Sequence, residues 1–472
     1  MRYPPLLTDL YELTMLAGYL EQGMENQPAV FDLFFRTNPF EGGYAVFAGL
    51  ESALQYLEDL WFSPADLEYL QGLELFQPRF IEFLAAFRFR CIVTAPPEGT
   101  VVFAVEPLLT IEGPLAEAQF VETALLNIIN FQTLVATKAA RINHAATGAR
   151  VIEFGLRRAQ GPDGGLSCAR AACVGGVRCT SNVQAGMGYG LAVQGTHAHS
   201  WVLAFSDELT AFRAYAATFP DKSVLLVDTY DTLTSGIPNA ITVARELRLS
   251  GHELRGIRLD SGDLAYLSRE ARRMLDDAGF TNVRIVASNE LDEYVITSVR
   301  DEGGCVDIYG VGTRLATCAG PGGGALGGVY KLVQIGDRPR MKTTSDMAKA
   351  TLPGKKRVLR VVSADGVFVQ DVVCLEQDRL QPRDRVLHPA NPLLNTTIPA
   401  DAELRDVRRV VMEKGERTSA PESLDDMADR TAQQLFLLPQ GCLRFVNPHR
   451  YKVSISEPLN DLKNRLLSEI ST

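Results

Sequence analysis

The chain has 472 residues, of which 46% are hydrophobic and 22% charged, a composition typical of a water-soluble globular protein. A chain of this length exceeds one core of common size, so we expect two or three domains. The formal net charge of -10 argues against a nucleic-acid binder, because a phosphate backbone requires a net basic face, although a local basic pocket stays open. The sequence shows neither a secretion signal nor a membrane-spanning apolar run, so we expect a cytoplasmic protein that does not enter membranes.

The eight cysteines include no C-x-x-C pair. Cys168, Cys173 and Cys179 form the closest group, and their spacing raises the question of a metal site. Zinc sites usually bring tight pairs and a fourth ligand, so we favour small buried thiols in a reducing compartment.

The first third of the chain alternates helical and strand-like patterns. An apolar stripe predicts a helix within residues 6–23, capped at Thr8 or Asp9. A strand-like stretch and two further helices follow, and then a group of short strands punctuated by proline and glycine. A long helix is expected to lead into the next region. The ranges are 31–36 for the strand, 49–60 and 78–87 for the helices, 91–114 for the short strands and 115–144 for the long helix.

Between residues 151 and 313, five short apolar runs each end in a polar or glycine-rich cluster before a helical segment: VIEF, SVLLV, LRGIRL, VRIVA and VDIYGV. Repeated strand, loop and helix is the signature of a parallel α/β sheet or barrel. Ligands of such folds bind at the carboxyl ends of the strands. The polar residues expected to gather there are Glu153, Arg157, Arg158, Asp228, Asp231, Asp260, Asp263, Ser288, Asn289 and Thr313.

The last part of the chain changes pattern. Residues 357–375 read as two alternating strands joined by a turn at Asp365-Gly366, which predicts a hairpin, and an amphipathic helix is expected near residues 456–470. We therefore divide the chain into a mixed α+β domain (1–145), an α/β barrel domain (146–335) and a region that packs on both (336–472), with a structural role expected for the last.

Arg258 and Asp260 share the parity of their strand and point to the same side. Both faces of a parallel strand are covered, so the pair has two interpretations. It is either a buried structural ion pair or an arginine that awaits a carboxylate or phosphate at the strand end.

The loop at residues 155–165 contains Arg157, Arg158 and several glycines between a strand and a helix. Glycines let the backbone approach phosphate oxygens, and a helix N-terminus favours an anion, although the P-loop spacing is missing. With DSGDL and GVGT at other strand ends, the loop suggests a substrate with several anionic groups and magnesium held partly by substrate phosphates.

The segment GTHAHSW brings His197 and His199 together, out of only six histidines in the chain. A near-neutral pKa suits acid-base or nucleophilic catalysis, whereas a single histidine is more often structural. Periodicity does not decide which of the two matters.

These segments resemble those of the nicotinate phosphoribosyltransferase family. The resemblance runs nearly end to end, through TDLYELTM, EFGLRRAQGPDGG, TSNVQAG, GTHAHSW, DTYDT, IRLDSGDL, GVGT, GGVYKL, PRMK with LPGKK, and NPHRYKVSISEPLNDLK. It implies a type II phosphoribosyltransferase-like open α/β barrel with an N-terminal mixed α+β domain and a small C-terminal region. It also implies condensation of nicotinate with phosphoribosyl pyrophosphate, coupled to ATP hydrolysis, in NAD salvage.

The resemblance assigns roles residue by residue. His199 matches the histidine that ATP phosphorylates; Tyr11, Thr196 and Arg258 match nicotinate-contacting positions, and Thr313 a phosphate-binding one. Arg157, Asp260 and Ser261 lie in motifs implied to surround phosphoribosyl pyrophosphate. Asp260 would also act in catalysis by stabilising positive charge at the ribose, while Mg²⁺ and arginines neutralise the leaving group. Family members are typically homodimers with shared active sites, which would place Tyr11 across an interface.

Two rival functions stay in view. A sister enzyme would act on nicotinamide or quinolinate, but His199 disfavours the ATP-independent quinolinate enzyme. A buried Arg258 should also reject the uncharged amide. A catalytically silent sensor of NAD precursors would have no need of the histidine. VGGVRC before TSN departs from the family's usual pattern, where Arg178 would alter the local potential.

Overall fold

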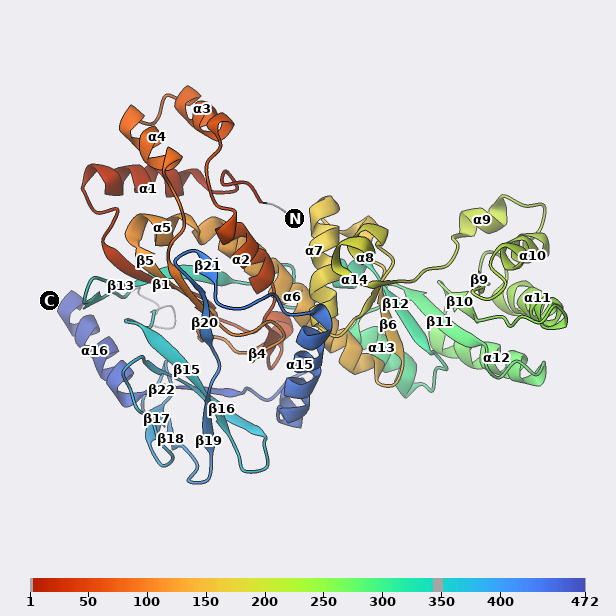
Figure 1. Ribbon diagram of the computed structural model, residues 1–472. Helices are drawn as coiled ribbons and strands as arrows, with labels where there is room; N and C mark the ends of the chain where they lie inside the picture. The colour runs from red at the N-terminus through yellow and green to blue at the C-terminus, as the bar shows by residue number, and fades with distance from the viewer. Residues whose placement is uncertain (1–2, 343–350, 472) are drawn as a thin grey trace. The chain divides into compact units, whose positions relative to one another are not determined.

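The structure, a computed structural model, describes residues 3–342 and 351–471 (Figure 1). The chain forms two compact units. Residues 1–137 together with 321–472 make the first unit, and residues 138–320 make the second. In the described part of the chain, no helix combines the length and apolar character needed to cross a membrane.

The second unit is built on a sheet of seven strands that all run parallel. In spatial order they are β8 (Ala192–Val193), β7 (Cys179–Thr180), β6 (Arg150–Glu153), β12 (Ile308–Val311), β11 (Arg284–Asn289), β10 (Gly256–Leu259) and β9 (Val224–Leu226). The five apolar runs of the sequence supply five of these strands, and β7 and β8 are two-residue additions. Because β8 and β9 are the two edges, the barrel is open.

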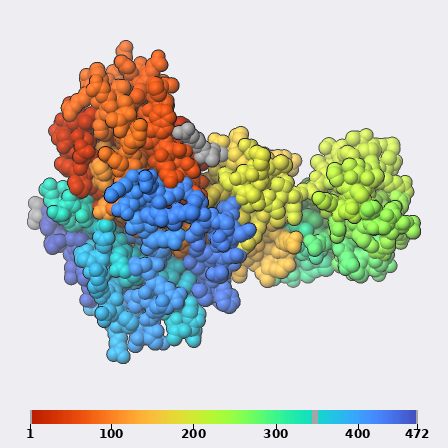
Figure 2. Space-filling view, in the orientation of Figure 1, coloured from red at the N-terminus to blue at the C-terminus, as the bar shows by residue number. Residues whose placement is uncertain are grey.

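Helices follow the strands and cover this sheet. They are α7 (Gly161–Val174), α8 (Val183–Tyr189), α9 (His199–Leu203), α10 (Glu208–Thr218), α11 (Ile237–Leu249), α12 (Leu264–Asp277), α13 (Glu293–Asp301) and α14 (Thr313–Ala316). In Figure 1, α10, α11 and α12 lie around the β9 and β10 end of the sheet. Figure 2 shows this stretch in yellow-green and green as continuous packed surface. Each strand of the sheet is thus followed by a helical segment that packs on the sheet, as the alternation predicts.

A buried ion-pair network fixes one of these helices. Glu293, the first residue of α13, forms ion pairs with Lys138 over 2.6 Å and with Arg141 over 2.8 Å, and all three side chains are at most 2% exposed. Burial alone would raise the pKa of Glu293, but the two cations lower it overall. The carboxylate is therefore ionised inside the unit, and removal of Glu293 would leave two buried cations without this counter-charge.

The first unit contains a seven-stranded sheet whose strands come from both ends of the chain. The order is β14 (Arg338–Pro339), β13 (Gly328–Ile335), β1 (Pro28–Phe35), β5 (Leu109–Pro114), β3 (Ile92–Ala95), β20 (Arg409–Glu413) and β21 (Glu416–Arg417). The expected division assigned β13 to the barrel domain. The structure pairs it antiparallel with β1 instead, so residues 321–335 belong with the first unit.

The helices of the first unit are α1 (Leu10–Glu21), α2 (Leu50–Glu58), α3 (Pro64–Gly72), α4 (Pro78–Ala85) and α5 (Leu115–Phe120), and a short β2 (Ala45–Val46) pairs with β4 (Val101–Val102). The long helix expected over residues 115–144 is two helices. It breaks at Val121, and α6 (Glu122–Ala146) then continues into the second unit.

The C-terminal part of the first unit forms a six-stranded sheet. Its order is β18 (Asn395–Thr397), β17 (Arg385–Leu387), β22 (Lys452–Ser456), β16 (Phe368–Leu375), β15 (Lys356–Val362) and β19 (Glu403–Asp406), with α15 (Leu424–Leu437) and α16 (Glu457–Ser471) beside it. The predicted hairpin is confirmed: β15 and β16 pair antiparallel, and Gly366 takes a positive φ of 81° in the turn. This region groups with residues 1–137 rather than forming a unit of its own.

Candidate active site

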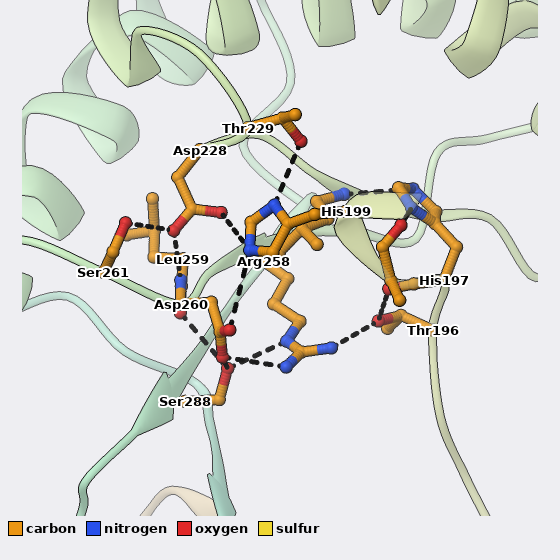
Figure 3. Close-up of polar contacts among 12 residues, drawn as sticks. Thr196, His197, His199, Asp228, Thr229, Arg258, Leu259, Asp260, Ser261 and Ser288 are labelled. Carbon is orange, nitrogen blue, oxygen red and sulfur yellow. Dashed lines mark hydrogen bonds and ion pairs between the residues drawn. The ribbon is translucent and has the colours of Figure 1, made fainter. Parts of the chain in front are cut away.

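The guanidinium of Arg258, on β10, is held by three side chains from three segments (Figure 3). Its Nε donates to Ser288 Oγ over 2.8 Å, its Nη1 to Thr196 Oγ1 over 3.1 Å and its Nη2 to Asp260 Oδ1 over 2.8 Å. The side chain is 13% exposed. Arg258 and Asp260 therefore form an ion pair on one side of the strand, as alternation predicts, and the ion pair orients a guanidinium that still reaches the surface.

Phe154, the last residue of the first apolar run, lies beside this arginine. The centre of its ring is 5.5 Å from Arg258 Cζ, a cation-π contact. Gly310 on β12 makes room for the ring, because a Cβ there would lie 2.6 Å from two of its carbons. Sequence reasoning missed Phe154, although its place at a strand end was a usable signal.

His199 begins α9 and faces a hydroxyl and two carboxylates (Figure 3). Its Nδ1 is 3.1 Å from Thr229 Oγ1, and its Nε2 lies 3.7 Å from Asp260 Oδ2 and 4.0 Å from Asp228 Oδ1. The imidazole is 41% exposed, so one side remains open to solvent or a ligand. Its nitrogens are thus oriented by the protein while the ring stays accessible, as a nucleophile requires.

The two carboxylates beside His199 are linked to each other. Asp228, with a side chain only 1% exposed, accepts from the Asp260 backbone N–H over 2.8 Å and from Ser261 Oγ over 2.6 Å. Both bonds use Oδ2, whereas Asp228 Oδ1 is buried and has no hydrogen-bond partner among the described residues. That oxygen is the one that faces His199 Nε2.

Asp260 is ionised at neutral pH. Burial alone would raise its pKa, but the bond from Ser288 and the charge of Arg258 lower the pKa below its usual value. Ser288 also donates to Asp260 Oδ1, so this oxygen has two partners while Oδ2 faces His199. One carboxylate therefore connects the arginine with the histidine.

His197 points away from this group into the packing. It is 7% exposed, and its Nε2 accepts from the Leu226 N–H over 3.2 Å. Burial lowers the pKa of His197, so the ring is neutral. The structure thus separates the two histidines, one open and one buried, which periodicity did not do.

The arginine-containing loop does not contact the Arg258 group in the described structure. Residues Leu156–Arg158 form a single 3-10 turn, and Arg157 and Arg158 are exposed. Beneath them the buried Glu153 accepts from Thr180 Oγ1 over 2.5 Å and from the Gly155 N–H. Burial raises the pKa of Glu153. These bonds fix the start of the loop and leave its cations free to meet a ligand.

Thr313, Asp263 and Asp231 were also expected at the strand ends. Thr313 begins α14 and donates to Glu290 Oε1 over 3.1 Å. Asp263 and Asp231 accept from backbone N–H groups of the helical turns that follow them, so they are helix caps. Their part in the expected gathering is therefore structural.

Tyr11 lies in the first unit, on α1, and is 45% exposed. Partial burial, followed by the charges of Glu122 and Glu12, raises its pKa to about 12, so the hydroxyl keeps its proton.

The three clustered cysteines are thiols and form no disulfide within the described residues. Cys168 and Cys173 are buried on α7 and Cys179 is partly exposed on β7. Burial raises the pKa of Cys168 and Cys179, which makes them poor nucleophiles. Over the stretches that the structure describes, no group of three or more His, Cys, Asp or Glu side chains is placed to hold a metal ion.

Comparisons with known proteins agree on one family. Residues 6–130 match the family profile of the nicotinate phosphoribosyltransferase N-terminal domain, and residues 355–463 match that of the C-terminal domain. The chain is 43% identical to the nicotinate phosphoribosyltransferase of Bacillus subtilis, over 99% of this chain and 96% of that one. It is 36% identical to the human enzyme of that name, over 98% and 96% of the two chains.

Solved structures give the same result. The crystal structure of human nicotinic acid phosphoribosyltransferase superposes with a TM-score of 0.87 at 33% identity, covering 97% of this chain and 99% of that one. Nicotinate-nucleotide pyrophosphorylase from Pyrococcus furiosus, at 23% identity, shares the fold with a TM-score of 0.72 over 92% and 95% of the two chains. The expected fold class is confirmed: an open, parallel α/β barrel accompanied by N-terminal and C-terminal domains. With relatives this similar over nearly its whole length, the chain belongs to the nicotinate phosphoribosyltransferase family.

Proposed function

We propose that this protein condenses nicotinate with phosphoribosyl pyrophosphate to give nicotinate mononucleotide and pyrophosphate. The reaction is coupled to ATP hydrolysis through a phosphohistidine at His199, and it belongs to NAD salvage by the Preiss-Handler route. The observation that carries the proposal is Asp260, whose two carboxylate oxygens face Arg258 and His199 at the carboxyl edge of a parallel sheet.

Arg258 is suited to the carboxylate of nicotinate. A guanidinium has five N–H groups, and Ser288, Thr196 and Asp260 occupy three of them. The two that remain lie one on each terminal nitrogen, the pair that a carboxylate accepts in a bidentate manner. Phe154 offers an aromatic surface beside the guanidinium for a flat pyridine ring. Nicotinamide carries no charge to pair with Arg258, so the site would select the acid.

Asp260 and the arginine loop suit the transfer of the ribosyl group. The pyridine nitrogen forms a bond to C1 of the ribose while the bond from C1 to the pyrophosphate oxygen breaks, and positive charge builds at the sugar. A carboxylate with a lowered pKa stabilises that charge. Arg157, Ser261 and Thr313 are expected to contact the phosphates of phosphoribosyl pyrophosphate.

Magnesium fits this arrangement as an ion carried on substrate phosphates. Mg²⁺ commonly keeps water and phosphate oxygens around it and needs few protein ligands. When bound, the ion would neutralise charge on the leaving pyrophosphate.

His199 suits a transient phosphoryl acceptor. One imidazole nitrogen forms a bond to the γ-phosphorus of ATP while the bond to the ADP oxygen breaks, and water later cleaves the nitrogen-phosphorus bond to release phosphate. Thr229 on Nδ1 and two carboxylates near Nε2 orient the ring for this reaction, and its 41% exposure leaves room for the nucleotide.

We further propose a homodimer in which Tyr11 of one copy completes the nicotinate site of the other. The exposure of Tyr11 on α1 and the open side of the His199 group are compatible with such sharing. A crosslinker attached at position 11 tests this proposal in a mixture of differently labelled copies. Crosslinks from position 11 to the second unit of another copy would support a shared site. Crosslinks within one copy alone would contradict it.

The deciding experiment measures nicotinate mononucleotide formation with and without ATP, for the parent protein and His199→Ala, with nicotinamide as the parallel substrate. We expect the parent protein to form product from nicotinate and not from nicotinamide. We expect ATP to stimulate the parent protein but not His199→Ala. Equal use of nicotinamide would refute the role of Arg258, and absence of product from either substrate would favour the silent sensor.

A further inference from the structure

The open edge of the barrel presents a backbone donor that needs a partner. Directly after β9, the Val227 N–H donates to the Arg258 carbonyl of β10 over 3.1 Å. Successive residues of a strand direct their N–H groups to opposite sides, so the Leu226 N–H points to the outer edge. Leu226 is 1% exposed, so water cannot serve its N–H, and a buried N–H without a partner destabilises the fold.

His197 supplies that partner. Its Nε2 accepts the Leu226 N–H over 3.2 Å, and its Nδ1 lies 3.3 Å from the carbonyl of Ala198. These contacts define one tautomer, because a nitrogen that accepts carries no hydrogen and the other nitrogen therefore donates. The imidazole of His197 thus takes the place that a neighbouring strand would occupy beside β9.

Aromatic side chains of α9 and α10 hold the imidazole in position. Tyr215 meets the ring edge-on with centroids 4.7 Å apart, and Phe212 packs at 6.2 Å. Trp201 packs on Tyr215 at 5.8 Å and donates from Nε1 to the Ala211 carbonyl over 3.0 Å. The contact between His197 and Leu226 therefore rests on a packed aromatic cluster that keeps it in one geometry.

The contact joins the two segments that meet at the site. In the first segment, Thr196 precedes His197 by one residue and His199 follows it by two (Figure 3). In the second segment, Asp228 and Thr229 follow Leu226 by two and three residues. A shift at this contact would move Thr229 relative to His199, and Thr196 relative to Arg258.

We propose that His197 is a positioning residue: its bond to the Leu226 N–H sets the register between His199 and Thr229 and between Thr196 and Arg258. His197 touches none of the reacting groups and acts through this placement alone. The inference rests on the proposed function, which defines the activity that the placement serves.

The test compares His197→Phe, which keeps a ring but removes the acceptor, with His197→Gln, whose amide oxygen restores it. His252→Phe is the matched control, because the His252 side chain is 35% exposed and bonds only to Asp221 among the described residues. Hydrogen exchange in the peptide that spans residues 224–229, phosphohistidine formation from ATP, and kcat and KM for nicotinate are measured for all three.

We expect His197→Phe to speed exchange at Leu226 and to lower phosphohistidine formation and kcat by about 30-fold, since misplacement by an ångström costs on this order. His197→Gln should recover to within about threefold, and His252→Phe should match the parent protein. If the Phe and Gln variants lost equal activity, the role of His197 would be packing and not hydrogen-bond acceptance. Full activity of a folded Phe variant would overturn the proposal. If the parent protein forms no nicotinate mononucleotide, the proposed function fails. Unchanged exchange in the Phe variant would still refute the placement on its own.

Discussion

Arg258 Nη2 and Asp260 Oδ1 are 2.8 Å apart, and the other oxygen of the same carboxylate faces His199 at 3.7 Å. This ion pair is thus shared between the residue proposed to bind nicotinate and the residue proposed to take phosphate from ATP. The charge of Asp260 therefore acts on both residues, and we expect the two reactions to be coupled through this carboxylate.

Neutralising Asp260 should impair both reactions together. We expect Asp260→Asn to lower kcat by about 100-fold, in the range typical of removing one stabilising group from an active site. The rate of phosphohistidine formation should fall with it, because Nε2 of His199 loses one of its two carboxylates. Rapid-quench measurement of both rates checks this. Asp263→Asn is the control three residues away, since asparagine keeps the helix cap there. A loss confined to one of the two reactions would contradict the shared role.

Removing the charge of Arg258 should abolish the preference for the acid. Arg258→Gln is expected to lower kcat/KM for nicotinate by about 100-fold or more, because the substrate carboxylate loses a bidentate partner. The rate with nicotinamide should change little, so the ratio of the two is the decisive quantity. Arg284→Gln removes the same charge from an exposed position at the opposite end of the neighbouring strand and should leave the ratio unaltered. Selectivity that survives in Arg258→Gln would assign recognition to other residues.

The contact at His197 predicts a pH effect. Burial, aided by the nearby Arg258 and His199, lowers the pKa of His197 below 6.5, although its bond to the Ala198 carbonyl opposes the shift. The folded state therefore prefers the neutral ring, and the stability and activity that depend on it are lost as pH falls through and below about 6.5. Tyr215 and Phe212, which pack on the ring, bring no charge. The ratio of kcat between His197→Gln and the parent protein, measured from pH 8 to pH 5, should rise toward the acid side. Parallel profiles would argue against the acceptor role.

Glu12 on α1 predicts a second, separate pH effect on stability. It is fully buried, its Oε2 accepts from Gln119 Nε2 over 2.8 Å, and its Oε1 has no hydrogen-bond partner in the described chain. Burial, with the charges of Glu122 and Asp9, raises its pKa from 4.5 to about 7. A raised carboxyl pKa means that stability is present at low pH and is lost as pH rises from about 4.5 to about 7.

We therefore expect Glu12→Gln to stabilise the protein by about 2 kcal/mol at pH 8 and to have little effect at pH 4.5, each pKa unit being worth about 1.4 kcal/mol. Thermal unfolding at the two pH values checks this. Glu21→Gln on the exposed end of the same helix is the control. A variant that is less stable than the parent at pH 8 would show that Glu12 is ionised and paired in the folded protein.

Local pattern was enough for the parallel sheet, because each strand run and its following helix are contiguous in the chain. Alternation also placed Arg258 and Asp260 on one side of β10, and the resemblance singled out His199 before any geometry was known. Phe154 escaped notice because an aromatic residue at a strand end looks the same whether it fills a core or faces a ligand. The ring packs on Ile152, Val286 and Ile308 and also lies beside Arg258, and these contacts follow from the pairing of strands that are distant in the sequence.

Other features depended on pairing between distant segments. β13 joins β1 almost 300 residues away, and nothing local in GGVYKL indicates that partner. The two-residue strands β7 and β8 are too short for any periodicity. The caps formed by Asp231 and Asp263 were counted as site residues because capping and ligand binding draw on the same side chains at strand ends.

The sheet that joins both ends of the chain has a consequence for biosynthesis. During translation, β1, β5 and β3 leave the ribosome early, but β13 and β20, which cover the two sides of that group, follow only after the whole of residues 138–320 has been made. Strands with unpaired edges invite association with other chains. The nascent protein therefore passes through a stage in which the second unit is fully synthesised while the sheet of the first still lacks the strands that cover its edges. A chaperone that shields strands would act at that stage.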